Sequence, residues 1–77
     1  MNTVRAWGEP LPGPLGTEPH GVTIPEAQAM LAHAVDGLHL GAYDRRMLAW
    51  ATHVWDQPTM AVVASIMWRA RQAPAPR

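Results

Sequence analysis

The sequence contains no cysteine and no phenylalanine, and all six of its basic residues are arginine. Without cysteine, neither a disulfide nor a thiolate metal site can hold this chain of 77 residues together. Domains of roughly 60 residues bury only about 60% of the surface that their unfolded chain exposes, and many need such a staple. Three sources of stability remain: a well-packed core, a metal bound by histidines, or association with a second subunit.

Charged residues are also scarce. They make up 16% of the chain, against about 25% in typical domains, and the formal net charge is zero. A neutral chain has no overall field that attracts nucleic acid or an anionic membrane. No apolar run approaches the ~20 residues that span a bilayer, and the N-terminus lacks the pattern of a signal peptide. We therefore expect a cytoplasmic protein with no membrane partner.

Proline and glycine, by contrast, are concentrated at the N-terminal end. They alternate through residues 1–22, and each proline biases its predecessor towards extended conformations. We therefore expect an extended arm over 1–22, serving as a linker or as a strap over the core. Residues 10–14 (PLPGP) also resemble generic proline-rich ligand peptides, which is the weaker interpretation.

Apolar periodicity predicts three amphipathic helices joined by tight links, over about residues 24–36, 42–55 and 57–72. The tail, 73–77, carries two prolines and should fray. The fold class is therefore all-α, with a three-helix bundle over 23–72. The apolar residues that we expect in its core are Ile24, Leu31, Val35, Leu38, Tyr43, Met47, Trp50, Val54, Met60, Val63 and Met67.

The predicted helix ends carry capping signals. Thr23 and Glu26 have the spacing of a capping box, in which the threonine hydroxyl accepts from the backbone three residues on. Asp56 suits the N-cap of the third helix. Asp44 lies in the first turn of the second helix, where a carboxylate favours the positive pole of the helix dipole. Glu26 lies opposite the apolar stripe on the helical wheel, so we expect its side chain on the solvent side.

The residues that carry chemistry indicate neither a metal site nor a catalytic centre. No two histidines have the i, i+3 or i, i+4 spacing that places two metal ligands on one helix face. The histidines are His20, His33, His39 and His53. A bundle of this size also struggles to enclose a substrate pocket of several hundred cubic ångströms. We therefore expect no enzyme, no cofactor and no metal.

The third predicted helix is apolar around more than half of its circumference. A helix of this kind favours burial on more than one side. Trp68 lies next to Ala61 and Ala64 on the wheel, which is the shape of an interface anchor. We therefore predict a non-enzymatic interaction module that binds itself or another protein through Trp68, Ala61, Ala64 and Trp7. The arm could equally well fold back and cover the apolar surface of this helix within the same chain. Three apolar residues that recur every four positions would provide the contacts: Trp7, Leu11 and Leu15.

A short link before the third helix is also typical of a helix-turn-helix domain, in which 57–72 would be the recognition helix. The polar residues that would contact nucleic acid are Arg45, Arg46, Gln57, Ser65 and Arg69. The zero net charge and the narrow polar face of this helix disfavour that interpretation. A small DNA-binding regulator is therefore the alternative function.

The stretch 40–71 carries several short motifs: residues 41–46 (GAYDRR), Trp50, Trp55 and Asp56, residues 58–65 (PTMAVVAS), and residues 69–71 (RAR). In these motifs the chain resembles short helical proteins of unknown function from high-GC actinobacteria and their phages. The resemblance implies no activity or ligand, and it assigns no role to any residue. It agrees with a composition rich in alanine, proline and arginine.

Overall fold

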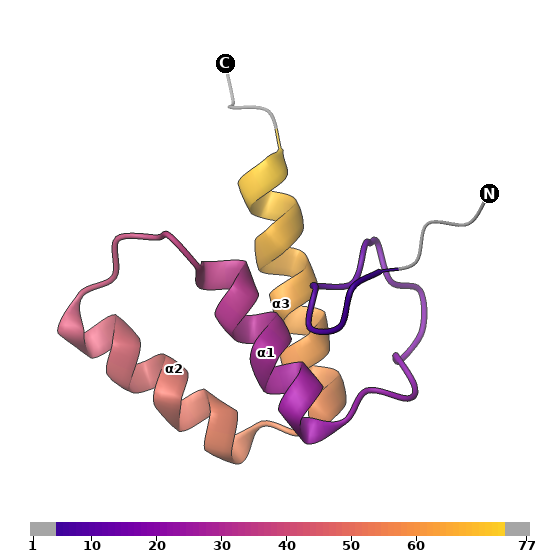
Figure 1. Cartoon of the computed structure of the whole chain (residues 1–77), viewed down its shortest axis with the longest axis horizontal. Helices are drawn as coiled ribbons and strands as arrows, with labels where there is room; N and C mark the ends of the chain where they lie inside the picture. The colour runs from indigo at the N-terminus through magenta and orange to yellow at the C-terminus, as the bar shows by residue number, and fades with distance from the viewer. Residues whose placement is uncertain (1–4, 74–77) are drawn as a thin grey trace.

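The computed structural model describes residues 5–73, and this part of the chain forms three α-helices and no β-strand. Helix α1 spans Ile24–Val35, α2 spans Ala42–Val54 and α3 spans Gln57–Gln72 (Figure 1). The all-α prediction is confirmed, and each helix begins and ends within one residue of the predicted bounds. The predicted fraying of the tail concerns residues that, apart from Ala73, lie outside the described range.

The capping signals of α1 and α2 operate as local sequence predicts. The Thr23 Oγ1 accepts the Glu26 N–H at 3.3 Å, which satisfies one of the free donors at the start of α1. The Asp44 Oδ2 accepts the Gly41 N–H at 2.9 Å and so closes the first turn of α2. The reciprocal half of the α1 capping box is absent from the described contacts, because the Glu26 carboxylate bonds to the arm instead.

Helix α3 begins at an aspartate cap. The Asp56 Oδ1 accepts the Thr59 N–H at 2.9 Å, and Pro58 lies in the first turn, where its missing N–H costs little. Hydrogen bonds from Thr59, first from its hydroxyl and then from its backbone N–H, hold the pKa of Asp56 below its usual value. The charged form of this carboxylate is therefore the one that stabilises the helix start.

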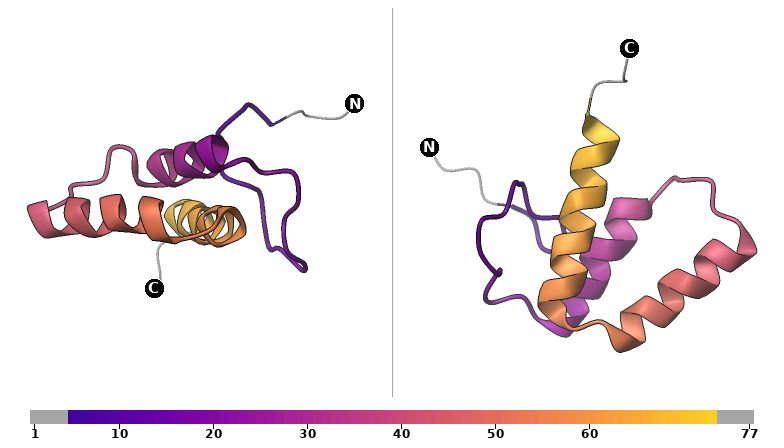
Figure 2. Two further views of the ribbon diagram at one scale, coloured as in Figure 1. Left: turned by 90° about the horizontal axis from the view of Figure 1, so that it is seen from below. Right: turned by 180° about the vertical axis from the view of Figure 1, so that it is seen from behind.

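The helices form two layers. Helices α1 and α3 pack against each other along their lengths, whereas α2 lies on the other side of α1 (Figure 1). Viewed from below, α1 forms one layer and α2 and α3 form the second (Figure 2, left). The two helices of the second layer diverge from their short link like the arms of a V (Figure 2, right). The smallest dimension of the molecule is 21 Å, which is two helices of about 10 Å diameter.

The core lies between α1 and α3 and consists of small residues and methionine. Its fully buried apolar members are Ala27, Met30, Leu31, Ala34, Met60, Ala61 and Ala64, and α2 adds only Ala51. Alanines on both helices allow α1 and α3 to approach closely, so little space is left for large side chains. The core therefore buries few large groups for a domain of this size.

Most of the predicted core is wrong. Leu31 and Met60 are buried as expected, and Val35, Val63 and Met67 are half-buried. Six residues that we expected in the core are exposed: Ile24, Leu38, Tyr43, Met47, Trp50 and Val54. The last four belong to α2, which packs through Leu48, Ala51 and Trp55 on a different side. That side lies about 100° round the helix from the predicted stripe.

Residues 5–22 contain no helix or strand and return along α1 and α3 (Figure 1). Leu11 and Val22 pack against the core cluster, and Pro10 is buried. The arm therefore covers one side of α3 within the same chain. Trp7 takes no part in this cover, because 67% of its surface is exposed.

Candidate functional site

The largest exposed apolar side chains gather on α2. Tyr43, Met47, Trp50 and Val54 are between 38% and 68% exposed. Their spacing of four, three and four residues places all of them on one side of the helix. Scattered apolar residues are normal on protein surfaces, but a contiguous row of four marks a surface that favours a partner.

The direction of this row follows from the residues on the opposite edge of α2. Arg45, Ala49 and Thr52 line a groove of about 230 Å³ that α2 forms with α1. In this groove the Gln28 Nε2 donates to the Thr52 carbonyl at 3.2 Å, which ties α2 to α1. The exposed row lies beyond Ala51, on the side of α2 turned away from that groove. It therefore belongs to the outer side of the layer that α2 and α3 form.

Helix α3 adds a residue to the same side. Ile66 is 52% exposed and lies about half a turn from Ala61 and Ala64, which face α1. Helices α2 and α3 lie in one layer (Figure 2, left), so the sides of both helices that are turned away from α1 belong to the far side of that layer. We refer to this surface as the outer face. It consists of Tyr43, Met47, Trp50, Val54 and Ile66.

The molecule has more surface than a compact monomer of its mass. Its accessible surface is 5706 Å², whereas a folded monomer of 8.4 kDa is expected to expose about 4,600 Å². Its radius of gyration is 12.9 Å, against about 11.5 Å for a compact chain of this length. The accessible surface therefore exceeds that of a compact monomer by about 1,100 Å².

The residues predicted to contact a partner have different environments. Ala61 and Ala64 are 0% exposed, so α1 of the same chain occupies the surface that they were expected to offer. Trp68 is half-buried, with the edge of the His33 ring at a centroid distance of 4.9 Å. The Arg71 guanidinium lies 5.4 Å from the centroid of the Trp68 ring. Trp68 therefore packs against residues of its own chain. The open apolar surface of the molecule is the outer face instead.

The predicted nucleic-acid contacts do not form one surface. Ser65 was expected on an open polar face, but it is 0% exposed, because its Oγ donates to the Leu11 carbonyl at 2.7 Å. The Arg69 Nε donates to the same hydroxyl at 3.3 Å, which directs Arg69 towards the arm. Gln57 is half-buried. The remaining two, Arg45 and Arg46, are exposed on α2, away from the arm side of α3.

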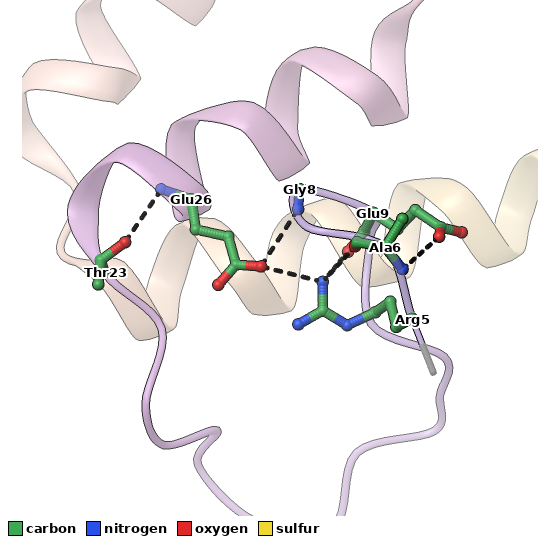
Figure 3. Close-up of polar contacts among 6 residues, drawn as sticks. All are labelled: Arg5, Ala6, Gly8, Glu9, Thr23 and Glu26. Atoms are coloured by element: carbon green, nitrogen blue, oxygen red, sulfur yellow. Dashed lines mark hydrogen bonds and ion pairs between the residues drawn. The ribbon is translucent and has the colours of Figure 1, made fainter. Parts of the chain in front are cut away.

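The arm is fastened to the start of α1 by Glu26 (Figure 3). Its Oε2 accepts the Gly8 N–H at 3.1 Å and an Arg5 Nη1 hydrogen at 3.3 Å. The same Arg5 nitrogen donates to the Glu9 carbonyl at 2.6 Å, and the Glu9 Oε1 accepts the Ala6 N–H at 2.6 Å. The expectation that Glu26 faces solvent is wrong, because the returning arm leaves only 9% of it exposed.

Within residues 5–73, no three histidine, cysteine, aspartate or glutamate side chains lie close enough together to hold a metal ion. None of the described helices has the length and apolar character needed to cross a membrane. Comparison with protein-family models, with curated proteins and with solved structures finds no match for this chain. Its function must therefore be inferred from the surfaces that the fold presents.

Proposed function

We propose that this chain is a non-enzymatic protein–protein interaction module that associates with a second copy of itself through the outer face. The observation that carries the proposal is the row of four large apolar side chains on the open side of α2. Self-association was expected from the apolar character of α3. Helix α3 contributes Ile66 to the outer face, while α2 contributes the greater part.

Burial of the outer face supplies a driving force of the right size. Covering the exposed halves of Tyr43 and Trp50 removes on the order of 200 Å² of apolar surface from each copy, worth about 5 kcal/mol. Two copies therefore gain about 10 kcal/mol from these rings, within the estimated range of about 4–15 kcal/mol that association costs. Met47, Val54 and Ile66 add the surplus that makes association favourable.

A second copy is the partner that suits this face best. The formal net charge is zero, so two copies do not repel each other, and neutral proteins tend to associate. A two-fold axis midway between Met47 and Trp50 would place α2 antiparallel to its copy. Each large ring would then lie against a narrower side chain, with Tyr43 opposite Val54 and Trp50 opposite Met47. The row is therefore complementary to itself.

The test compares two tryptophan substitutions by sedimentation equilibrium. Trp50→Ser removes a ring from the centre of the row. Tryptophans at the centre of an interface typically contribute at least about 2 kcal/mol to the free energy of binding, so the dissociation constant should rise about thirtyfold. Trp7→Ser removes a ring that is more open to solvent than Trp50, at 67% against 52%, but lies on the arm. We expect Trp50→Ser alone to dissociate the dimer, with its helix content unchanged. Equal dissociation constants for wild type and Trp50→Ser would refute the proposal.

A further inference from the structure

The contact between the arm and α3 has the character of a peptide-binding groove with its ligand in place. Leu11 inserts against the core cluster, while its carbonyl accepts from the fully buried Ser65 hydroxyl. Pro10 is buried beside it. Pro10 and Pro12 line a cleft of about 440 Å³ together with Trp68. Grooves that bind proline-rich segments combine the same features, namely an aromatic wall, an apolar seat and a donor to a backbone carbonyl.

Gly13 lies against the end of the Arg69 side chain in this groove. A Cβ atom at this position would collide with the Nε and Cζ of Arg69, so the guanidinium lies directly against the arm backbone. Arg69 is held there by its bond to Ser65. The groove therefore holds a segment with an apolar residue and its carbonyl at Ser65, and the residue two positions later lies at Arg69.

The segment that joins the arm to α1, residues 16–21, forms none of the hydrogen bonds that fasten the arm. Cβ atoms built at Gly16 and Gly21 would meet nothing within 4 Å. Between them, Thr17, Glu18 and His20 are exposed, whereas Pro19 is half-buried beside the start of α3. The hydrogen bonds that fasten the arm run from residues 5–11 to α1 and α3, and none of them involves this connection. The arm of another copy can therefore form every one of these bonds unchanged.

We propose that the groove on α3 binds the proline-rich arm of a second copy, by exchange with the arm of its own chain. The exchange retains the hydrogen bonds of residues 5–11 and changes the path of residues 16–21, which now lie beside the start of α3. It does not depend on the outer face, because Ser65 and Ile66 lie on different sides of α3. The Trp50→Ser variant tests that face separately.

A cysteine trap in the full chain tests the exchange, since the natural sequence has no cysteine to interfere. Two single variants, Gly13→Cys and Arg69→Cys, are mixed in a glutathione redox buffer and followed by intact mass. The new side chain at position 13 displaces the end of Arg69 in its own chain, whereas the groove of the other variant has the shorter cysteine at that position. The double variant Gly13→Cys/Arg69→Cys, as a dilute monomer, shows whether the two positions are close enough to form a disulfide.

Arm exchange predicts a disulfide-linked heterodimer in excess of the proportion that random collision gives. The same excess should persist when both chains also carry Trp50→Ser, because the outer face is not required. Closure of the double variant without any excess of heterodimer would overturn the exchange. Failure of the double variant to close would also overturn it, because the arm would then not lie on α3 in this register.

Discussion

Ser65→Ala is the substitution that probes the arm most directly. The Ser65 hydroxyl is fully buried and is the only group on α3 that donates a hydrogen bond to the described arm, at 2.7 Å from the Leu11 carbonyl. It also accepts from the Arg69 Nε at 3.3 Å. Alanine keeps the helix and removes nothing but the hydroxyl, so any change reports on these two bonds.

The loss of stability depends on whether the former partners of the hydroxyl, the Leu11 carbonyl and the Arg69 side chain, can bond to water instead. A neutral hydrogen bond contributes about 0.5–1.5 kcal/mol net, and an unsatisfied buried partner costs about 1–3 kcal/mol. Leu11 and Arg69 are both half-buried, so water reaches the groups that the substitution frees in part. We therefore expect a loss of about 1–2 kcal/mol, which lowers the Tm of a domain of this size by roughly 5–15 °C.

Thermal unfolding followed by circular dichroism gives the Tm, and amide hydrogen exchange shows where protection is lost. Protection should fall in residues 8–13 while that of α2 is retained. Thr17→Ala is the matched control, because it removes an exposed hydroxyl from the same arm. If Ser65→Ala and Thr17→Ala melted at the same temperature, the arm would not be held by this bond.

Substitutions at three further residues test the helix starts and the ion pair that fastens the arm. Glu26→Gln removes the charge that pairs with Arg5; the Arg5 side chain is 28% exposed and that of Glu26 is 12% exposed. We expect the free energy of unfolding in urea to fall by about 1 kcal/mol. An unchanged urea midpoint would mean that this ion pair does not fasten the arm. Thr23→Ala should cost about 1 kcal/mol by the same assay, whereas Thr23→Ser should not. The lowered pKa of Asp56 means that its charge stabilises the fold above the usual value of 3.8, and this contribution is lost as the pH falls through the folded pKa. The difference in Tm between wild type and Asp56→Asn should therefore narrow below pH 3.8, and a constant difference would show that the charge is immaterial.

The helices were predictable because their signals are local. Thr23 and Asp56 each bond to a backbone N–H three residues away, so the sequence around them suffices to place the helix starts. Glu26 was misplaced because its partner, Gly8, lies 18 residues away, and no local pattern reports that the arm returns to it.

The packing of α2 was not predictable from periodicity. Its apolar residues occupy two neighbouring sides, and the side with the larger residues, Tyr43 and Trp50, was assigned to the core. The fold buries the other side, on which Ala51 is buried and Leu48 and Trp55 pack against the core cluster. The wide apolar arc that Leu48 and Trp55 add to α2 was the available signal that this helix has more apolar surface than one interface needs.

Light scattering on the eluting wild-type chain, over a range of concentrations, tests self-association most directly. Self-association through the outer face predicts twice the chain mass of 8.4 kDa at high concentration and a return to 8.4 kDa on dilution. A single mass of 8.4 kDa at every concentration up to about 1 mM, where even −4 kcal/mol of association would be visible, would contradict it.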